Sequence, residues 1–290
     1  MVNKNSAEYI EELENKIVDL SLKLKGKSNQ LKNIENENYE RIRKLVHNLK
    51  NPIGIAYSFS EMIAESSEKI SKEKLEKYTD IIQKSTAFSI EILNALASLN
   101  RLKSPKFKLN YQNSNYCEYI TNVVKKFKTE KDNRDISIEM NVPKNSVFLS
   151  FDINEITNVI DNILSNAMRF SSNSPTVSIA VIETEKTVET IITNAFKYSK
   201  EKTDVVILAK IDGDDVILKV TDHGIGISES DLHHIFDEFW VVNTYSENNN
   251  KCVGLGLAIA KIIVNYHNGE IKASSCLGKG TAFSFTLPKV

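Results

Sequence analysis

Apolar side chains recur at alternating steps of three and four along the first 45 residues of the chain. The seam comprises Ile10, Leu13, Ile17, Leu20, Leu24, Leu31, Ile34 and Leu45, with Lys27, Asn38 and Arg41 as polar members of the same lattice. A seam that persists for about five heptads is typical of a coiled coil. We therefore predict a coiled-coil helix over residues 1–40, in a parallel dimer whose register Asn38 helps to fix. The alternative is one long helix packed against its own domain.

The apolar face becomes broader after residue 41, and a polar stretch at residues 65–71 separates two helical segments. The first segment carries apolar residues up to Ile63, and the second carries them from Leu75 to Leu99 at helical spacing. A broad apolar face suits a helix bundle better than a two-stranded seam. We predict a helical hairpin over residues 41–104, which dimerises into a four-helix bundle.

Pro52 stands inside the first predicted helix, where a proline removes a backbone hydrogen bond and kinks the axis. His47 lies five residues earlier, towards the edge of the apolar face, so we expect its imidazole to be partly exposed. A lone exposed histidine is usually an ordinary surface residue. Its position before a kinking proline, on a dimeric bundle, makes His47 a candidate for chemistry.

Glycine and proline residues divide the chain into two regions. Of ten glycines only Gly26 and Gly54 precede residue 213, and of five prolines only Pro52 precedes residue 105. We therefore predict a helical N-terminal part, a short linker at residues 103–106, and a mixed α/β domain over residues 108–290.

A strand pattern in this domain ends in a carboxylate and two glycines. Apolar and polar residues alternate over 216–221 and run directly into Asp222, which Gly224 and Gly226 follow. Glycines at such a position allow the backbone to approach a planar ligand closely.

A second pair of glycines opens an apolar helix. Gly254 and Gly256 alternate with Leu255 and Leu257 at its start. The free N–H groups and the positive dipole of a helix N-terminus favour a phosphate group. The polar, asparagine-rich residues 243–251 lie between the two pairs, and we predict that they form a mobile lid.

Five sequence motifs follow one another from residue 47 to the C-terminus. They are His47–Pro52, Asp222–Gly226, Phe236–Phe239, Gly254–Leu257, and Gly278–Phe283 with the terminal Leu287–Pro288. In this order they resemble the H box, first glycine box, F box, second glycine box and closing strands of the sensor histidine kinases of two-component systems. The resemblance covers residues 40–290.

The resemblance implies a signalling coiled coil, a dimerisation and histidine phosphotransfer bundle, and an α/β-sandwich ATP-binding domain of the GHKL (Bergerat) type, shared with gyrase, Hsp90 and MutL proteins. It implies a transferase, itself a phosphoprotein, that autophosphorylates His47 from ATP and passes the phosphate to an aspartate on a response regulator. Such a transfer depends on positioning and charge neutralisation. By the same resemblance, Asp222 would hold the adenine amino group, and the Gly254–Gly256 helix start and Mg²⁺ would hold the phosphates.

The family's asparagine box precedes the first glycine box, and this chain offers two candidates. Asn162 and Asn166 are four residues apart, on one face of a predicted amphipathic helix over 152–170, and Arg169 follows for phosphate contact. We favour Asn162 and Asn166 as the magnesium and phosphate residues because their helix is well patterned and has an acidic start.

The second candidate box is Asn194, with Thr190 in place of the partner asparagine and Lys197 three residues on. Its spacing to Asp222 suits the family better, although its upstream residues read as strand. Residues 166–193 and 194–221 share seven identities without gaps, so we interpret them as a 28-residue tandem duplication.

Two asparagines in the H box bear on the balance of activities. Asn48 occupies a position where many members of the family have an acid that helps to deprotonate the histidine, and an amide cannot accept that proton. Asn51 matches a residue associated with dephosphorylation of the regulator. The pair predicts a phosphatase-leaning enzyme.

Charge and composition limit the classes of partner and the cellular location that the sequence allows. The net charge is -1, which gives no electrostatic case for nucleic acid or an anionic membrane as partner. The N-terminus lacks a signal peptide, and no apolar run approaches a membrane span. Three cysteines without CxxC spacing argue against a disulfide framework, so we expect a cytoplasmic protein. No sensor domain is recognisable, so we expect the signal to come through a partner, an upstream segment or the coiled coil.

Two other functions remain as alternatives. One is an ATPase or serine kinase that uses the same nucleotide fold without a phosphohistidine. The other is a catalytically weak dimeric scaffold whose nucleotide site only sets conformation.

Overall fold

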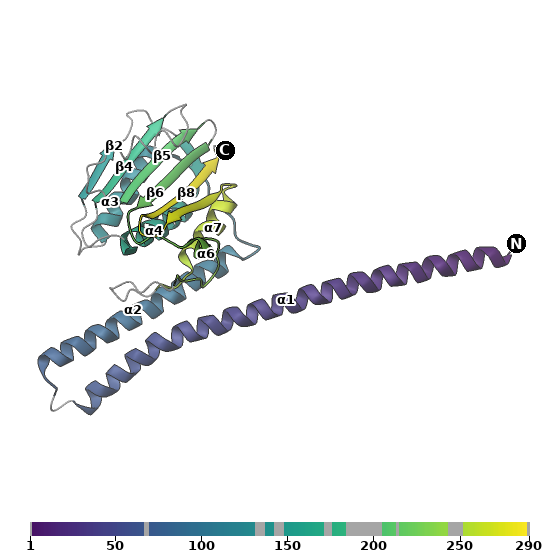
Figure 1. Ribbon diagram of the computed structural model, residues 1–290, viewed down its shortest axis with the longest axis horizontal. Helices are drawn as coiled ribbons and strands as arrows, with labels where there is room; N and C mark the ends of the chain where they lie inside the picture. Colours follow the sequence, from purple (N-terminus) through teal and green to yellow (C-terminus); the bar gives the residue numbers. More distant parts are fainter. Residues whose placement is uncertain are drawn as a thin grey trace. The chain divides into compact units, whose positions relative to one another are not determined.

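The computed structural model describes residues 2–66, 70–130, 137–141, 148–170, 176–183, 205–212, 215–242 and 252–288. The chain divides into two compact units, Met1–Ser89 and Ile90–Val290. Helix α2 belongs to both units because it begins in the first and ends in the second (Figure 1). A helical N-terminal region followed by an α/β domain confirms the fold class predicted from the sequence.

The first unit is a helical hairpin. Helix α1 runs without interruption from Val2 to Glu65, and helix α2 runs from Lys72 to Leu102. The turn between them falls within the polar stretch at 65–71, as predicted. The rings of Phe59 and Tyr78 pack edge to face at 5.0 Å and join the two helices near this turn.

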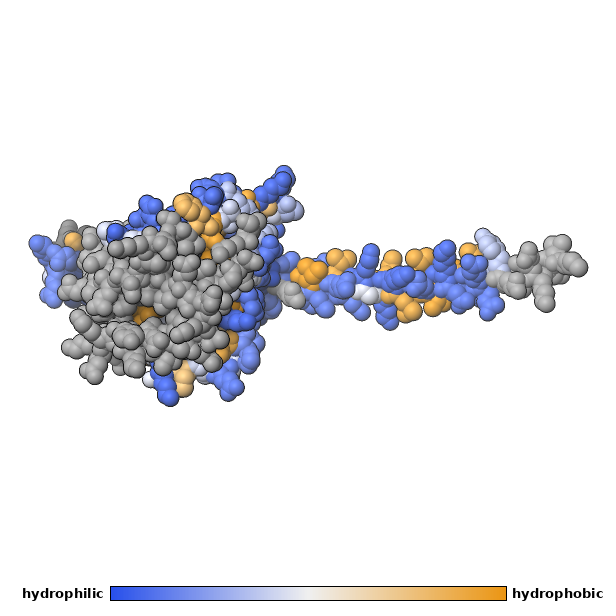
Figure 2. All heavy atoms as spheres, turned by 90° about the horizontal axis from the view of Figure 1, so that it is seen from above, coloured by the Kyte–Doolittle hydropathy of each residue, from blue (hydrophilic) through white to orange (hydrophobic). Residues whose placement is uncertain are grey.

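The apolar seam of α1 is exposed from Leu13 to Ile34. Leu13, Ile17, Leu20, Leu24, Leu31 and Ile34 all lie on the surface of the single chain. Figure 2 shows orange, apolar side chains among the blue ones along this helix. The described residues contain no helix long and apolar enough to cross a membrane.

The second unit is built on a mixed six-stranded sheet. Its strand order is β2-β4-β5-β6-β8-β7. The strands are β2 (Ser137–Asn141), β4 (Thr176–Glu183), β5 (Val205–Asp212), β6 (Asp215–Asp222), β7 (Ile271–Cys276) and β8 (Gly280–Pro288). Two further strands, β1 (Gln112–Asn115) and β3 (Phe148–Phe151), form a separate antiparallel pair.

Three helices lie on one face of the sheet: α3 (Tyr116–Glu130), α4 (Ile153–Phe170) and α7 (Gly256–Tyr266) (Figure 1). A short helix, α6 (Glu229–Leu232), follows β6. Helix α4 packs against both α7 and β6. Its apolar stripe is buried, including Ile156, Ile160 and Ile163, which are at most 1% exposed. The core of this unit therefore fixes α4 and α7 side by side.

The parallel pairing of β4 and β5 has the same period as the sequence repeat. Val177 pairs with Val205, and Ile179 pairs with Ile207, an offset of 28 residues (205 − 177). These two pairs are also among the seven identities of the proposed duplication. Residues that are equivalent in the two copies therefore lie next to each other in the sheet. The stretch 184–200, which contains Asn194 and Lys197, lies outside the described residues.

Candidate functional site

Asp222 is the last residue of β6, and its carboxylate is buried at 4% exposure. Its Oδ1 accepts hydrogen bonds from the backbone N–H of Gly224 at 3.0 Å and of Thr281 at 3.1 Å. Burial raises the pKa of the Asp222 carboxyl, and the two amide donors and His223 oppose that rise. The carboxylate is thus held in one orientation at the edge of the sheet.

The loop after Asp222 lies directly against the end of α4. A Cβ atom at Gly224 would stand 2.1 Å from the carbonyl oxygen of Phe170, the last residue of that helix. No side chain fits into this space, which explains why the position is glycine. Gly226 is buried at the other end of the loop, close to the carbonyl oxygen of Cys276.

The other end of the site is the start of α7. Gly256 is its first residue, and a Cβ there would stand 2.6 Å from Oδ1 of Asn162. The side chain of Asn162 is oriented by a hydrogen bond from its Nδ2 to the carbonyl oxygen of Asn158, at 2.8 Å. Leu255 caps α7 without a side-chain hydrogen bond, so its first N–H groups have no side-chain acceptor from the cap.

The segments around the second glycine box are joined by the backbone. The N–H of Phe239 donates to the carbonyl oxygen of Gly254 at 2.8 Å, so the F box and this glycine box are adjacent. Leu255 is fully buried and Leu257 is half-buried. Residues 243–251, predicted to be a lid, lie outside the described residues.

Helix α4 therefore touches both glycine boxes, at Asn162 and at Phe170. Asn166 is half-buried and lies one helical turn beyond Asn162 on the same face. The backbone of Arg169 belongs to the same helix, but its side chain is outside the described part of the structure, as are Asn194 and Lys197.

The oxygen donors here suit a hard divalent cation. Within the described ranges, no group of three or more His, Cys, Asp or Glu side chains comes together. Asn162 and Asn166 on α4 instead offer amide oxygens, and that of Asn162 lies at the start of α7. Mg²⁺ takes oxygen ligands, keeps several waters and is commonly completed by substrate phosphates, so this donor set fits it.

The H box lies on α1, in the other unit. His47 and Asn51 are exposed one helical turn apart, and Asn48 is half-buried. Pro52 lies inside the helix and is buried. The predicted phosphate acceptor is thus an accessible imidazole on a helix.

Two contacts of the site could not be read from the sequence. The Phe170 contact is made by a backbone carbonyl, which any residue type would supply. Thr281 holds Asp222 through its backbone N–H, and its only sequence signal was membership of the closing-strand motif Gly278–Phe283.

Comparison with known proteins shows which proteins this chain resembles. Residues 182–290 match the family described as histidine kinase-, DNA gyrase B-, and HSP90-like ATPase. The sensor histidine kinase WalK of Bacillus subtilis is 28% identical over 257 residues, which cover 88% of this chain and 37% of that protein. The resemblance to sensor histidine kinases is confirmed. The sensor protein kinase WalK of Staphylococcus aureus (strain MRSA252) is 26% identical over 255 residues, again with 88% and 37% coverage.

Solved histidine kinase structures share the fold. The histidine kinase AdeS of Acinetobacter baumannii has a TM-score of 0.55 at 20% identity, over 84% of this chain and 98% of that one. The histidine kinase ThkA, in a complex with the response regulator protein TrrA, has a TM-score of 0.59 at 21% identity, over 87% and 61%. This chain spans 37% of the length of the two WalK relatives.

Proposed function

We propose that the chain is a protein-histidine kinase that uses Mg-ATP to phosphorylate His47 and then passes the phosphate to an aspartate of a response regulator. The observation that carries the proposal is that α4 touches both glycine boxes, through Asn162 at Gly256 and Phe170 at Gly224. This contact brings an amide-bearing helix, a buried carboxylate and a helix N-terminus into one site.

The residues of the site have complementary roles towards ATP. The buried carboxylate of Asp222 accepts a hydrogen bond from the adenine amino group. Gly224 and Gly226 allow the loop after Asp222 to pack against the backbone of Phe170 and Cys276. The N–H groups at the start of α7, from Gly254 to Leu257, bind phosphate oxygens. Asn162 and Asn166 hold Mg²⁺, which neutralises phosphate charge, and Arg169 contacts a phosphate.

The chemical step joins a ring nitrogen of His47 to the γ-phosphorus of ATP, while the bond from that phosphorus to the bridging oxygen of ADP breaks. The imidazole must be neutral to supply a lone pair to the phosphorus. Its N–H proton is lost as the phosphoryl group is gained. Asn48, next to His47, cannot accept that proton, so we propose a slow forward reaction, and Asn51 supports dephosphorylation of the regulator.

The acceptor is tested by labelling the protein with γ-labelled ATP. His47→Gln should abolish the acid-labile label and leave Mg-ATP affinity unchanged, because the acceptor and the nucleotide residues lie in different units. Labelling of the variant at the wild-type level would contradict the assignment and favour a serine kinase. An unlabelled wild type that still binds Mg-ATP would favour a scaffold.

The choice between the two asparagine boxes is tested by a matched pair of variants. Asn166→Asp puts a carboxylate beside the phosphates, and Asn194→Asp makes the same change in the other box. We propose that only Asn166→Asp disrupts Mg-ATP binding, because Asn162, its helical neighbour, lies against Gly256. The reverse result would assign nucleotide binding to Asn194 and Lys197.

The proposal includes three kinds of partner. The exposed seam of α1 supports a parallel homodimer, because an apolar stripe of this length is stable when paired with a second copy. The receiver domain of a response regulator is the proposed phosphate acceptor, as the complex of ThkA with TrrA suggests by analogy. The input is an upstream sensor or a partner protein.

A further inference from the structure

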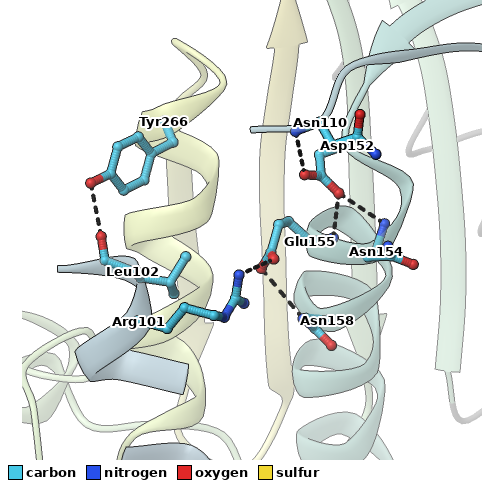
Figure 3. Close-up of polar contacts among 8 residues, drawn as sticks. All are labelled: Arg101, Leu102, Asn110, Asp152, Asn154, Glu155, Asn158 and Tyr266. Carbon is cyan, nitrogen blue, oxygen red and sulfur yellow. Dashed lines mark hydrogen bonds and ion pairs between the residues drawn. The ribbon is translucent and has the colours of Figure 1, made fainter. Parts of the chain in front are cut away.

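The last turn of α2 is attached to three elements around the candidate nucleotide site. Nη1 of Arg101 lies 2.7 Å from Oε1 of Glu155, in the first turn of α4. The hydroxyl of Tyr266, the last residue of α7, donates to the carbonyl oxygen of Leu102 at 2.8 Å. The amine of Lys103 pairs with the carboxylate of Glu238 in the F box. Figure 3 shows the first two attachments; we call Arg101, Leu102 and Lys103 the latch.

The ion pair of Arg101 is a built contact rather than a loose surface pair. The side chain of Glu155 is only 6% exposed, and its other oxygen accepts from Nδ2 of Asn158 at 3.4 Å. The hydrogen bond to Glu155 raises the pKa of Arg101, and the guanidinium also lies over the ring of Phe107 at 5.1 Å. The Arg101 side chain is 47% exposed, so the buried member of the pair is Glu155. Removing Arg101 would leave the buried carboxylate of Glu155 without its cation, unlike the loss of one partner of a fully exposed pair.

The linker that follows the latch is tied to the same helix start. The backbone N–H of Asn110 donates to Oδ2 of Asp152 at 2.8 Å. Oδ1 of Asp152 accepts from the N–H groups of Asn154 and Glu155, at 3.1 and 3.2 Å, and so caps α4 (Figure 3). The start of α4 is therefore held by Arg101, before the linker, and by Asn110, after it.

Each attached element also carries candidate nucleotide residues. Glu155 and Asn162 are seven residues apart, two helical turns on one face of α4. Tyr266 ends the helix that Gly256 begins. Glu238 directly precedes Phe239, whose N–H bonds to Gly254. A packed helix moves as a body, so a displacement of the latch reaches Asn162, Gly256 and Gly254 together.

We propose that Arg101 is a positioning residue, and that the latch transmits movements of α2 to α4 and α7 and so sets the affinity for Mg-ATP. The proposal rests on the proposed function of that site. Because α2 belongs to both units, the latch is a covalent and packed route between the helical hairpin and the nucleotide site. Coupling of this kind is reciprocal, so Mg-ATP should in turn order the end of α2.

The test is Mg-ATP affinity of the full chain, measured by titration calorimetry. Arg101→Ala should weaken binding at least about fivefold. The matched control is Lys84→Ala on the same helix, which removes an exposed pair with Asp80 of the same 2.7 Å length and should change affinity less than about twofold. Exchanging the charges, Arg101→Glu with Glu155→Arg, should recover most of the loss, since effects in one pair are not additive.

A purely structural role predicts a different pattern. If Arg101→Ala lowers the unfolding temperature but leaves Mg-ATP affinity within about twofold of wild type, the proposal is overturned. Should Arg101→Ala fail to fold, Arg101→Lys, which keeps the charge without the planar fork, replaces it in the same measurement.

Failure of the kinase reaction alone would appear as an unlabelled wild type that still binds Mg-ATP, and the affinity test would still apply. Failure of nucleotide binding at this site would be recognised separately, because the wild type itself would then bind no Mg-ATP. In that case, amide hydrogen exchange tests whether the latch transmits movement to α4 and α7. Arg101→Ala should speed exchange of amides in 158–166 and 256–262, which are remote from the substitution. Acceleration confined to 99–105 and 153–156 would show that the latch transmits nothing.

Discussion

Gly256 lies directly against the side-chain amide of Asn162. A Cβ there would lie 2.6 Å from Oδ1 of Asn162, closer than any ordinary contact. We expect Gly256→Ala to displace the Asn162 amide from the site with little loss of stability, because the group that must move is the end of a flexible side chain. Mg-ATP affinity should fall about tenfold, which calorimetry would measure.

Gly54→Ala is the matched control for that substitution. Gly54 lies within α1, and no atom stands within 4 Å of the added Cβ. It should stabilise the helix by about 0.5–1 kcal/mol and leave nucleotide affinity unchanged. An undiminished affinity of Gly256→Ala would mean that Asn162 is not a nucleotide ligand.

Asn48 tests how far proton removal limits the forward reaction. A carboxylate at this half-buried position could take the imidazole proton that an amide cannot, and such help is typically worth about 10²–10⁴-fold. We expect Asn48→Asp to raise the single-turnover labelling rate at saturating Mg-ATP. Asn51→Ala should instead reduce dephosphorylation of the regulator. Equal labelling rates for Asn48→Asp and wild type would remove the main support for a phosphatase-leaning enzyme.

The sequence predicts residue types at the site better than it predicts contacts. Asp222, Gly224 and Gly256 stand out because few other residues suit their positions. The choice between Asn166 and Asn194 stays open in the sequence, because a repeat of 28 residues places both at plausible distances from Asp222. In the sequence, a well-patterned helix with an acidic start favours Asn162 and Asn166. The contact of Asn162 with Gly256, between α4 and α7, adds support that no local pattern contains.

At the scale of helices, hydrophobic periodicity predicts helix length reliably where one apolar pattern persists along the sequence. The seam predicted a long helix, and the polar stretch at 65–71 predicted the turn, because neither requires knowledge of a distant partner. The latch, in contrast, could not be predicted from the sequence, because it depends on a contact between two separate helices. Arg101 and Glu155 read as ordinary surface charges until α2 and α4 are brought together, and the burial of Glu155 is what gives the pair its importance.

The exposed seam of α1 makes a prediction at the same scale. Ile17 and Leu24 are 61% and 74% exposed in the single chain, which apolar residues at seam positions of a stable coiled coil are not. Ile17→Lys with Leu24→Lys should shift the protein from dimer to monomer in sedimentation velocity. Leu22→Lys is the control, because Leu22 is 65% exposed but lies off the seam. A monomeric wild type, or a dimer that survives the double change, would contradict a coiled coil.

At the scale of the whole molecule, the pairing of β4 with β5 repeats the period of the sequence duplication. Parallel β4 and β5 lie between β2 and β6, and their register offset equals the 28-residue repeat. Side-chain alternation has a period of two, so an arbitrary pairing could have taken many offsets. The coincidence is expected if β5 is a copy of β4 that pairs with its original, residue for equivalent residue.

A duplication of this kind predicts that one copy is dispensable. Removing 178–205 joins Val177 to Val206, and removing 166–193 joins Ser165 to Asn194. Both excisions leave a single strand between α4 and β6 and keep an asparagine four residues after Asn162. We expect both shortened proteins to fold and to bind Mg-ATP within about tenfold of wild type, by circular dichroism and calorimetry.

The length of the excision is the decisive control. Removing 26 residues, 166–191, would place Asn194 six positions after Asn162 instead of four, on the opposite side of the helix because each residue turns by about 100°. That protein should lose Mg-ATP binding although it retains more of the chain than either 28-residue excision. If both proteins with a 28-residue excision are unfolded, β5 is an integral strand of this sheet. The hypothesis that β5 arose as a dispensable copy of β4 is then wrong.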